Sequence, residues 1–234
     1  MYNLTNKIKV VDLALLVKDT LIISDIHIGY EEELNKRGVM LPRLSFKDIM
    51  VRLEKILKEV HKDVKTIVIN GDLKHEFGKI SEQEWRETLQ LIDFLAKFGK
   101  LILVKGNHDA ILGPIADKRN VELVNEYKID DILILHGDKL IDIPNGIKTI
   151  IIGHEHPAIS LQEENRKEKF KCFLKGKYEG KTLIVMPSFN PITEGSDVLQ
   201  EKKLSPYLQM DLGEFEVFII SDKIYEFGKL KNLL

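Results

Sequence analysis

The sequence predicts an α/β fold, because short apolar strands alternate with amphipathic helices along the chain. Runs rich in isoleucine, leucine and valine recur, and each is too short for a helix but typical of a buried strand. These runs are TLIISD, TIVINGD, LILVKGN, ILILHG, TIIIGHEH and TLIVMPS. The length of 234 residues suits one substantial core, so we expect a single domain over residues 1–234.

Amphipathic helices are expected between the strands. Residues 45–61 place their apolar side chains on one helical face, with Ser45 as the expected N-cap. Residues 81–98 form a second such helix, in which Ser81 opens a capping box. The acidic run YEEEL at 30–34 is predicted to be the solvated first turn of another helix.

Potential metal ligands follow five of the predicted strands, at the point where each strand ends. In open α/β sheets the ligand site lies outside the carboxyl ends of the strands, so we expect these ends to converge. An isolated pair such as His154 and His156 would be typical of a surface turn, but here it belongs to a series. The series is Asp25, His27, Asp72, Asn107, His108, Asp109, His136, His154 and His156.

The chemistry of the series predicts two divalent transition-metal ions. Imidazoles, carboxylates and one amide suit Mn, which we expect first, or Fe, Zn, Co or Ni, and so many histidines argue against Mg or Ca as the sole occupant. Without His108 and Asp109, seven ligand side chains remain, too many for one ion that also keeps an open position. Asp72 is expected to bridge two ions roughly 3.5 to 4 Å apart.

The ordered motifs resemble the calcineurin-like metallophosphoesterase superfamily. Over roughly residues 10–200 the chain is similar to the SbcD-related phosphoesterases of archaea and to their bacterial relatives associated with a DNA ligase. This resemblance implies a four-layer sandwich of two mixed β-sheets, packed face to face and flanked by helices. The motifs that carry it are SDIHIGYEEEL, NGDLKHEFG, IIGHEHPAI and MPSFNPITEGSD.

The resemblance also implies how the ligands divide between the two ions. It places Asp25, His27, Asp72 and His156 around one ion, and Asp72, Asn107, His136 and His154 around the other. Two cations that hold one water supply a hydroxide nucleophile near neutral pH, so no serine or cysteine nucleophile is needed for in-line attack at phosphorus. The resemblance makes His108 the general acid for the leaving oxygen, a task suited to a titrating imidazole.

The sequence departs from the superfamily pattern at one position. Many members read G-D-x-x-D, with the last aspartate orienting the catalytic histidine, whereas this chain reads GDLKH and has His75 there. His75 could hold His108 through a neutral tautomer, Glu76 or Asp109 could take over that contact, or His75 could be a spectator.

The segment 166–181 is the only strongly basic block of the sequence. It has seven lysine and arginine residues against two glutamates. On a hairpin beside the metal site it could follow the phosphate backbone of DNA or RNA, with aromatic residues available for stacking. The alternative is a solvated hairpin face that prevents edge pairing.

Together these observations predict a metal-dependent phosphoesterase, expected to be a phosphodiesterase or nuclease acting on nucleic acid or nucleotides. The alternatives are a phosphomonoesterase and a noncatalytic phosphate-binding scaffold on the same fold. A DNA-repair partner is implied by the resemblance only.

Charge, cysteine content and hydropathy argue against several classes of protein and of site. The net charge of -2 argues against binding nucleic acid over the whole surface. The only cysteine, Cys172, excludes an internal disulfide framework and a thiolate-rich metal site. Since no apolar stretch approaches the ~20 residues of a membrane helix, we expect a cytoplasmic protein without a membrane partner.

Overall fold

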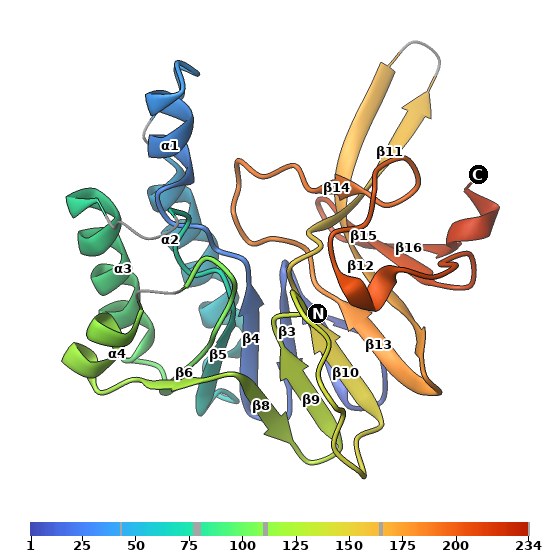
Figure 1. Cartoon of the computed structure of the whole chain (residues 1–234), viewed down its shortest axis with the longest axis horizontal. Helices are drawn as coiled ribbons and strands as arrows, with labels where there is room; N and C mark the ends of the chain where they lie inside the picture. The colour runs from blue at the N-terminus through green and yellow to red at the C-terminus, as the bar shows by residue number, and fades with distance from the viewer. Residues whose placement is uncertain (43, 77–80, 110–111, 164–165, 234) are drawn as a thin grey trace.

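The computed structural model describes residues 1–42, 44–76, 81–109, 112–163 and 166–233, and within them two mixed β-sheets pack face to face (Figure 1). The expected α/β fold of two mixed sheets with helices outside is confirmed. No helix in the described ranges is long and apolar enough to cross a membrane.

The first sheet has the order β1-β2-β3-β4-β5-β6-β7 in the described residues. Its first four strands pair antiparallel, and β4 to β7 are parallel. The strands span Tyr2–Asn3, Ile8–Val11, Ala14–Val17, Thr20–Ser24, Thr66–Asn70, Lys100–Val104 and Glu122–Val124.

The second sheet has the order β14-β11-β12-β13-β10-β9-β8, with β15 paired to β12 and β16 to β15. At its centre β9, β10 and β13 are parallel, whereas the hairpin of β11 and β12 is antiparallel. The strands β8 to β16 span Glu126–Ile129, Ile132–Leu135, Thr149–Ile152, Pro157–Glu163, Arg166–Tyr178, Lys181–Val185, Ser196–Asp197, Glu216–Ile220 and Ile224–Lys229.

The central strands of the second sheet are apolar on both faces. Side chains alternate across a strand, so Ile151 points into the core between the sheets while Ile150 and Ile152 point to the opposite face. That opposite face is covered by the segment 198–215 and by two short 3-10 helices, η1 at Pro206–Leu208 and η2 at Leu230–Asn232. Burial on both faces explains why these strands read as unbroken apolar runs.

Four α-helices in the described ranges lie outside the first sheet, on the side away from the second (Figure 1). The N-cap prediction is confirmed for α3, where Ser81 Oγ accepts a hydrogen bond from the Glu84 amide, but it is wrong for α2. Leu44 occupies the N-cap of α2, and the Ser45 amide donates to the Glu31 carboxylate at 2.9 Å instead. The helices α1 to α4 span Tyr30–Lys36, Ser45–Val60, Glu82–Leu95 and Gly113–Arg119.

The acidic first turn of α1 differs from the solvated turn that we expected. Glu31 is buried and Glu33 is half-buried, because this turn faces the loop that follows β5. Its carboxylates pair with groups of the protein, Glu31 with the Ser45 amide and Glu33 with Arg37 and His75.

Candidate metal centre

The five strand ends that carry potential ligands lie together in the structure. Parallel strands bring their carboxyl ends to one edge of a sheet, and the two stacked sheets place the ends of β4, β5 and β6 against those of β9 and β10. Of three groups of described side chains there whose ligand atoms lie within 4.8 Å of one another, two include a carboxylate. These two are Asp25 with His27 and His156, and Asp72 with His136 and His154, and the third is His27 with His75 and His108.

The first group points its ligand atoms at one small volume. His27 Nε2 lies 3.2 Å from His156 Nε2, and His156 Nε2 lies 3.2 Å from Asp25 Oδ1. Asp25 is fully buried and also accepts a hydrogen bond of 2.6 Å from the Ser24 hydroxyl. These contacts among nitrogen and carboxylate oxygen atoms are those of a site arranged for a cation.

The second group is arranged in the same way. His136 Nε2 lies 3.2 Å from His154 Nδ1 and 3.3 Å from Asp72 Oδ2. Asn107 Oδ1 is 3.0 Å from the same His136 nitrogen, so the structure brings the predicted amide ligand into this group.

Asp72 lies between the two groups. Its Oδ2 atom is 3.3 Å from His136 Nε2 on one side and 3.7 Å from His27 Nε2 on the other. Its Oδ1 atom accepts a hydrogen bond of 2.9 Å from the His108 amide. This position agrees with the predicted bridging role.

Two glycines make room for the carboxylates. A Cβ atom on Gly106 would overlap with Asp72 Oδ1 and the Asp72 amide, and a Cβ atom on Gly153 would overlap with Ser24 Oγ and Asp25 Oδ2. The glycines of the GNH and GHEH motifs are therefore required by close approach of the backbone to the two acids.

The protonation of the site fits divalent metal ions. Burial lowers the pKa of His27 well below its usual value, which favours the neutral imidazole that binds a metal. Burial raises the pKa of Asp72, but the hydrogen bond and charge of His136 outweigh it and hold that pKa below the usual range. For His136, burial lowers the pKa, yet the bond to Asp72 and the charge of Asp25 raise it to about 9. Without a metal, His136 is the positive group between two carboxylates, a place that a cation would take.

Five of the seven predicted ligands have left-handed backbone conformations, with φ between 47° and 62°. Such conformations are uncommon for residues with a side chain. Here they turn successive side chains of each loop back toward the same volume. The five are Asp25, His27, Asp72, His154 and His156.

The structure places the three predicted catalytic residues in different environments. The ring of His108 stacks on that of His75 at 5.2 Å, and His108 Nδ1 contacts the backbone carbonyl of His75. Asp109 is buried and accepts hydrogen bonds from the amides of Leu73 and Gly106, at 3.1 and 3.0 Å. Burial, with the charge of Asp72, raises its pKa to about 7. Asp109 thus joins the loops after β5 and β6, and the His108 ring is held by a main-chain group.

The loop after β13 supports the site from behind, a role that the sequence motifs did not indicate to us. Asn190 Nδ2 donates to the carbonyls of Ile26 and His27, at 2.9 and 3.0 Å, and Ser188 Oγ donates to the carbonyl of Asp25 at 2.8 Å. The available signal was MPSFN, which follows a predicted strand just as the ligand motifs do.

The described side chains of the basic segment 166–181 do not share one surface, although both expectations placed the segment on a hairpin. Lys171 is largely withdrawn from solvent, and its ammonium donates to the carbonyls of Ser188, at 2.7 Å, and Asn190. Burial lowers its pKa to about 7, and the positive charge of Arg52 acts in the same direction. Lys171 therefore supports the loop behind the metal centre. The side chain of Arg166 lies outside the described residues.

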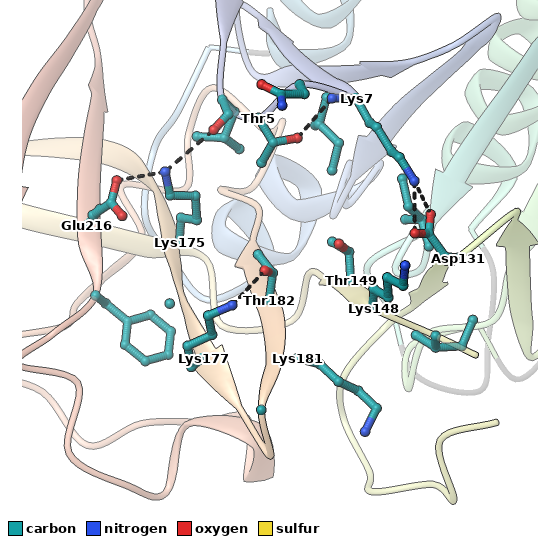
Figure 2. A pocket seen from close by; sticks show the side chains of 18 of the residues that line it. Thr5, Lys7, Asp131, Lys148, Thr149, Lys175, Lys177, Lys181, Thr182 and Glu216 are labelled. Atoms are coloured by element: carbon teal, nitrogen blue, oxygen red, sulfur yellow. Dashed lines mark hydrogen bonds and ion pairs between the residues drawn. The ribbon is translucent and has the colours of Figure 1, made fainter. Parts of the chain in front are cut away.

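Three other lysines of the segment lie at the opposite edge of the second sheet. There, at the amino ends of β10 and β13, is a groove with a volume of about 970 Å³ (Figure 2). Two of its lysines are already paired, Lys175 with Glu216 at 2.7 Å and Lys7 with Asp131 at 2.7 Å. The lysines of the basic segment that line this groove are Lys175, Lys177 and Lys181.

Comparisons with known proteins agree with this geometry. The family model of the calcineurin-like phosphoesterases matches residues 19–213. A search of curated proteins finds no significant match.

Among solved structures, the nuclease MPE of Pseudomonas putida superimposes with a TM-score of 0.64 at 19% identity, over 92% of this chain and 91% of that chain. A protein of unknown function from Aquifex aeolicus gives 0.36 at 23% identity, over 58% and 78% of the two chains. The zinc complex of Vps29 from Entamoeba histolytica gives 0.37 at 17% identity, over 88% and 90%. Only the first score is high enough to support a shared fold. Since the family model covers most of the chain, this protein belongs to the calcineurin-like phosphoesterase family and is a metal-dependent phosphoesterase.

Proposed function

We propose that this protein is a phosphodiesterase that hydrolyses nucleic acid or nucleotides with two bound divalent metal ions, Mn being the first choice. The observation that carries the proposal is the pair of ligand groups that meet at Asp72, with His108 beside them. The similar structure from Pseudomonas putida is named a nuclease, which supports a diester substrate.

The residues divide into two sets in this proposal. Asp25, His27 and His156 would hold one ion, His136, His154 and Asn107 would hold the other, and Asp72 would contact both. When bound, the two ions would supply an activated water and neutralise charge on the phosphate oxygens.

His108 is proposed to deliver a proton to the leaving oxygen. Its Nδ1 atom contacts the carbonyl oxygen of His75, which only accepts hydrogen bonds, so the proton of the neutral ring is on Nδ1. The Nε2 atom lies on the side of the ring facing Asp72, 3.9 Å from its Oδ2. In the doubly protonated ring Nε2 carries the second proton, which is therefore positioned at the metal centre, where the leaving oxygen would develop charge. After donating that proton the ring would be neutral, with its remaining proton on Nδ1.

A substrate panel tests the class of phosphoester. With Mn present, we expect bis-p-nitrophenyl phosphate and single-stranded or double-stranded DNA to be hydrolysed faster than p-nitrophenyl phosphate. A preference for the monoester would favour a phosphomonoesterase. Stoichiometric metal binding without hydrolysis of any substrate would favour a noncatalytic scaffold.

The hairpin of β11 and β12 offers a direct test of nucleic-acid binding. It starts at Pro157, next to His156, and rises above the carboxyl edge of the sheets (Figure 1). Lys167 on it is exposed, and Lys169 is half-buried, and the two bond to Gln200 and Glu201. Replacing both with glutamine is expected to weaken DNA binding and to reduce the log-log salt slope by about 0.7 to 0.9 for each phosphate that is no longer neutralised by a lysine.

The matched control for this variant replaces Lys177 and Lys181, which line the groove at the opposite edge. It removes the same charge, so a general electrostatic effect would weaken binding equally in both double variants. Hydrolysis of the small p-nitrophenyl diester should stay unchanged in both. If the two variants bind DNA alike, the hairpin does not contact the backbone.

A further inference from the structure

Glu33 contacts the metal centre indirectly, through the side chain of His75. It lies on α1, where its Oε1 atom pairs with the Arg37 guanidinium and its Oε2 atom pairs with His75 Nε2. Both Glu33 and His75 are half-buried, with side-chain exposures of 21% and 16%, so this contact is partly shielded from water. An ionised carboxylate only accepts hydrogen bonds, and the proton between the two groups therefore belongs to His75 Nε2.

The same assignment follows independently from the metal side. His27 Nε2 is the nitrogen aimed at the first ligand group, 3.2 Å from His156 Nε2. A neutral imidazole that binds a metal through Nε2 carries its proton on Nδ1. His27 Nδ1 lies 3.3 Å from His75 Nδ1. Two ring nitrogens can share a hydrogen bond only if one donates and the other accepts, so His75 Nδ1 has the lone pair and its proton is again on Nε2.

Backbone pairing holds the two histidines side by side. The His27 amide donates to the carbonyl of Asp72 at 2.9 Å, and the His75 amide donates to the carbonyl of Ile28 at 2.9 Å. An isolated parallel bridge joins Ile28 to Lys74 between them. The pairing of β4 with β5 thus continues past the strand ends and sets the relative positions of the rings.

We propose that Glu33 is a positioning residue, which acts through His75 to fix the tautomer and orientation of the metal ligand His27. The inference rests on the proposed function, since it assigns His27 to a metal ion. The chain of contacts runs from Glu33 to His75 Nε2, and from His75 Nδ1 to His27 Nδ1. A carboxylate outside the ligand shell that orients a histidine typically changes metal affinity or activity by about 10- to 100-fold.

The tautomer of His75 is the first test. Long-range proton–nitrogen NMR of the imidazoles, in wild-type protein loaded with diamagnetic Zn, reports which nitrogen carries the proton, and a His75→Gln variant assigns the signals. We expect the proton on His75 Nε2 and on His27 Nδ1. A His75 ring with its proton on Nδ1 would overturn the proposal.

Metal affinity is the second test. Calorimetric titration of metal-free protein with Mn is expected to show that Glu33→Ala weakens one of the two binding steps about 10- to 100-fold and leaves the other unchanged. Glu33→Gln keeps an acceptor oxygen without the charge and should fall between Glu33→Ala and the wild type. The matched control is Glu32→Gln on the same helix, because Glu32 pairs with Ser81 at 2.6 Å and with Lys36, away from the histidines.

Unchanged affinities in Glu33→Ala, or an equal loss in Glu32→Gln, would contradict the proposal. Circular dichroism shows whether a variant has folded. If Glu33→Ala does not fold, the tautomer of His75 in the wild-type protein still tests the proposal. If wild-type protein binds no Mn at all, the proposed function fails, and the His75 tautomer still judges the contact with Glu33.

Discussion

Replacing Asp72 with asparagine is expected to reduce the bound metal from two ions to one or none and to lower phosphoesterase activity by roughly a thousandfold or more. The Asp72 Oδ2 atom lies between His27 and His136, so one carboxylate serves both ligand groups. Metal ions supply several kcal/mol of transition-state stabilisation, and each ~1.4 kcal/mol is a factor of ten in rate. Asparagine keeps the size of the side chain but loses its charge.

Metal analysis after reconstitution with Mn measures this effect directly. The matched control is Asp138→Asn, a half-buried carboxylate two residues after His136 that belongs to neither ligand group. The control should retain two ions per chain. Two ions in the Asp72 variant, bound as tightly as in the wild type, would mean that the ions are not bridged by this residue.

The second large effect is expected for His108→Ala, which should keep both metal ions and lose activity by roughly 10²- to 10⁴-fold. The contact between residue 108 and Asp72 Oδ1 is made by the backbone amide, so alanine retains it. Only the imidazole, and with it the proton for the leaving oxygen, is removed.

A series of leaving groups separates proton donation from a general loss of structure. An ester of p-nitrophenol needs little help from an acid, whereas a phenyl or alkyl ester needs much, so the loss in His108→Ala should grow along that series. His61→Ala, at the exposed end of α2, serves as the histidine control. An equal loss for all leaving groups would remove His108 as the acid, and a loss of metal would make it a ligand.

The location of the metal centre could be predicted from the sequence because it depends on a local rule. The strand that ends at Ser24 and the strand that ends at Asn70 are parallel neighbours, so the residues that follow them must meet at one edge. No detail of packing was needed for that step. The apolar runs were recognised as strands for the same reason, since burial on both faces removes polar residues from them.

The burial of individual side chains along β12 could not be predicted from the sequence. The lysines at 167, 169, 171, 175 and 177 have even spacings, which place their side chains on one face of β12, and a solvated hairpin face was one of the two expectations for this segment. Periodicity identifies the face but not what covers it. Where the hairpin enters the sheet, the loop after β13 covers Lys171, while Lys167 remains exposed.

The contacts of His75 were also beyond the reach of the sequence. Its partner Glu33 is 42 positions earlier in the chain and reaches it only because α1 folds over the loop after β5. Holding His108 through a neutral His75 tautomer was one of the expectations and stays a prediction. The structure adds a contact of His108 Nδ1 with the carbonyl of His75, a group that any residue would supply.

The left-handed ligand residues have a consequence for the stability of the metal-free protein. Each such conformation costs a residue with a side chain roughly 1 to 2 kcal/mol, so five together approach the ~5 to 15 kcal/mol of net stability that a whole domain has. Strain stored in the folded loops lowers the free energy of their local opening. A ligand that binds only the closed form shifts that equilibrium by mass action. The supply of metal in the surroundings would therefore govern how long these loops survive a protease, in addition to how fast the protein turns over its substrate.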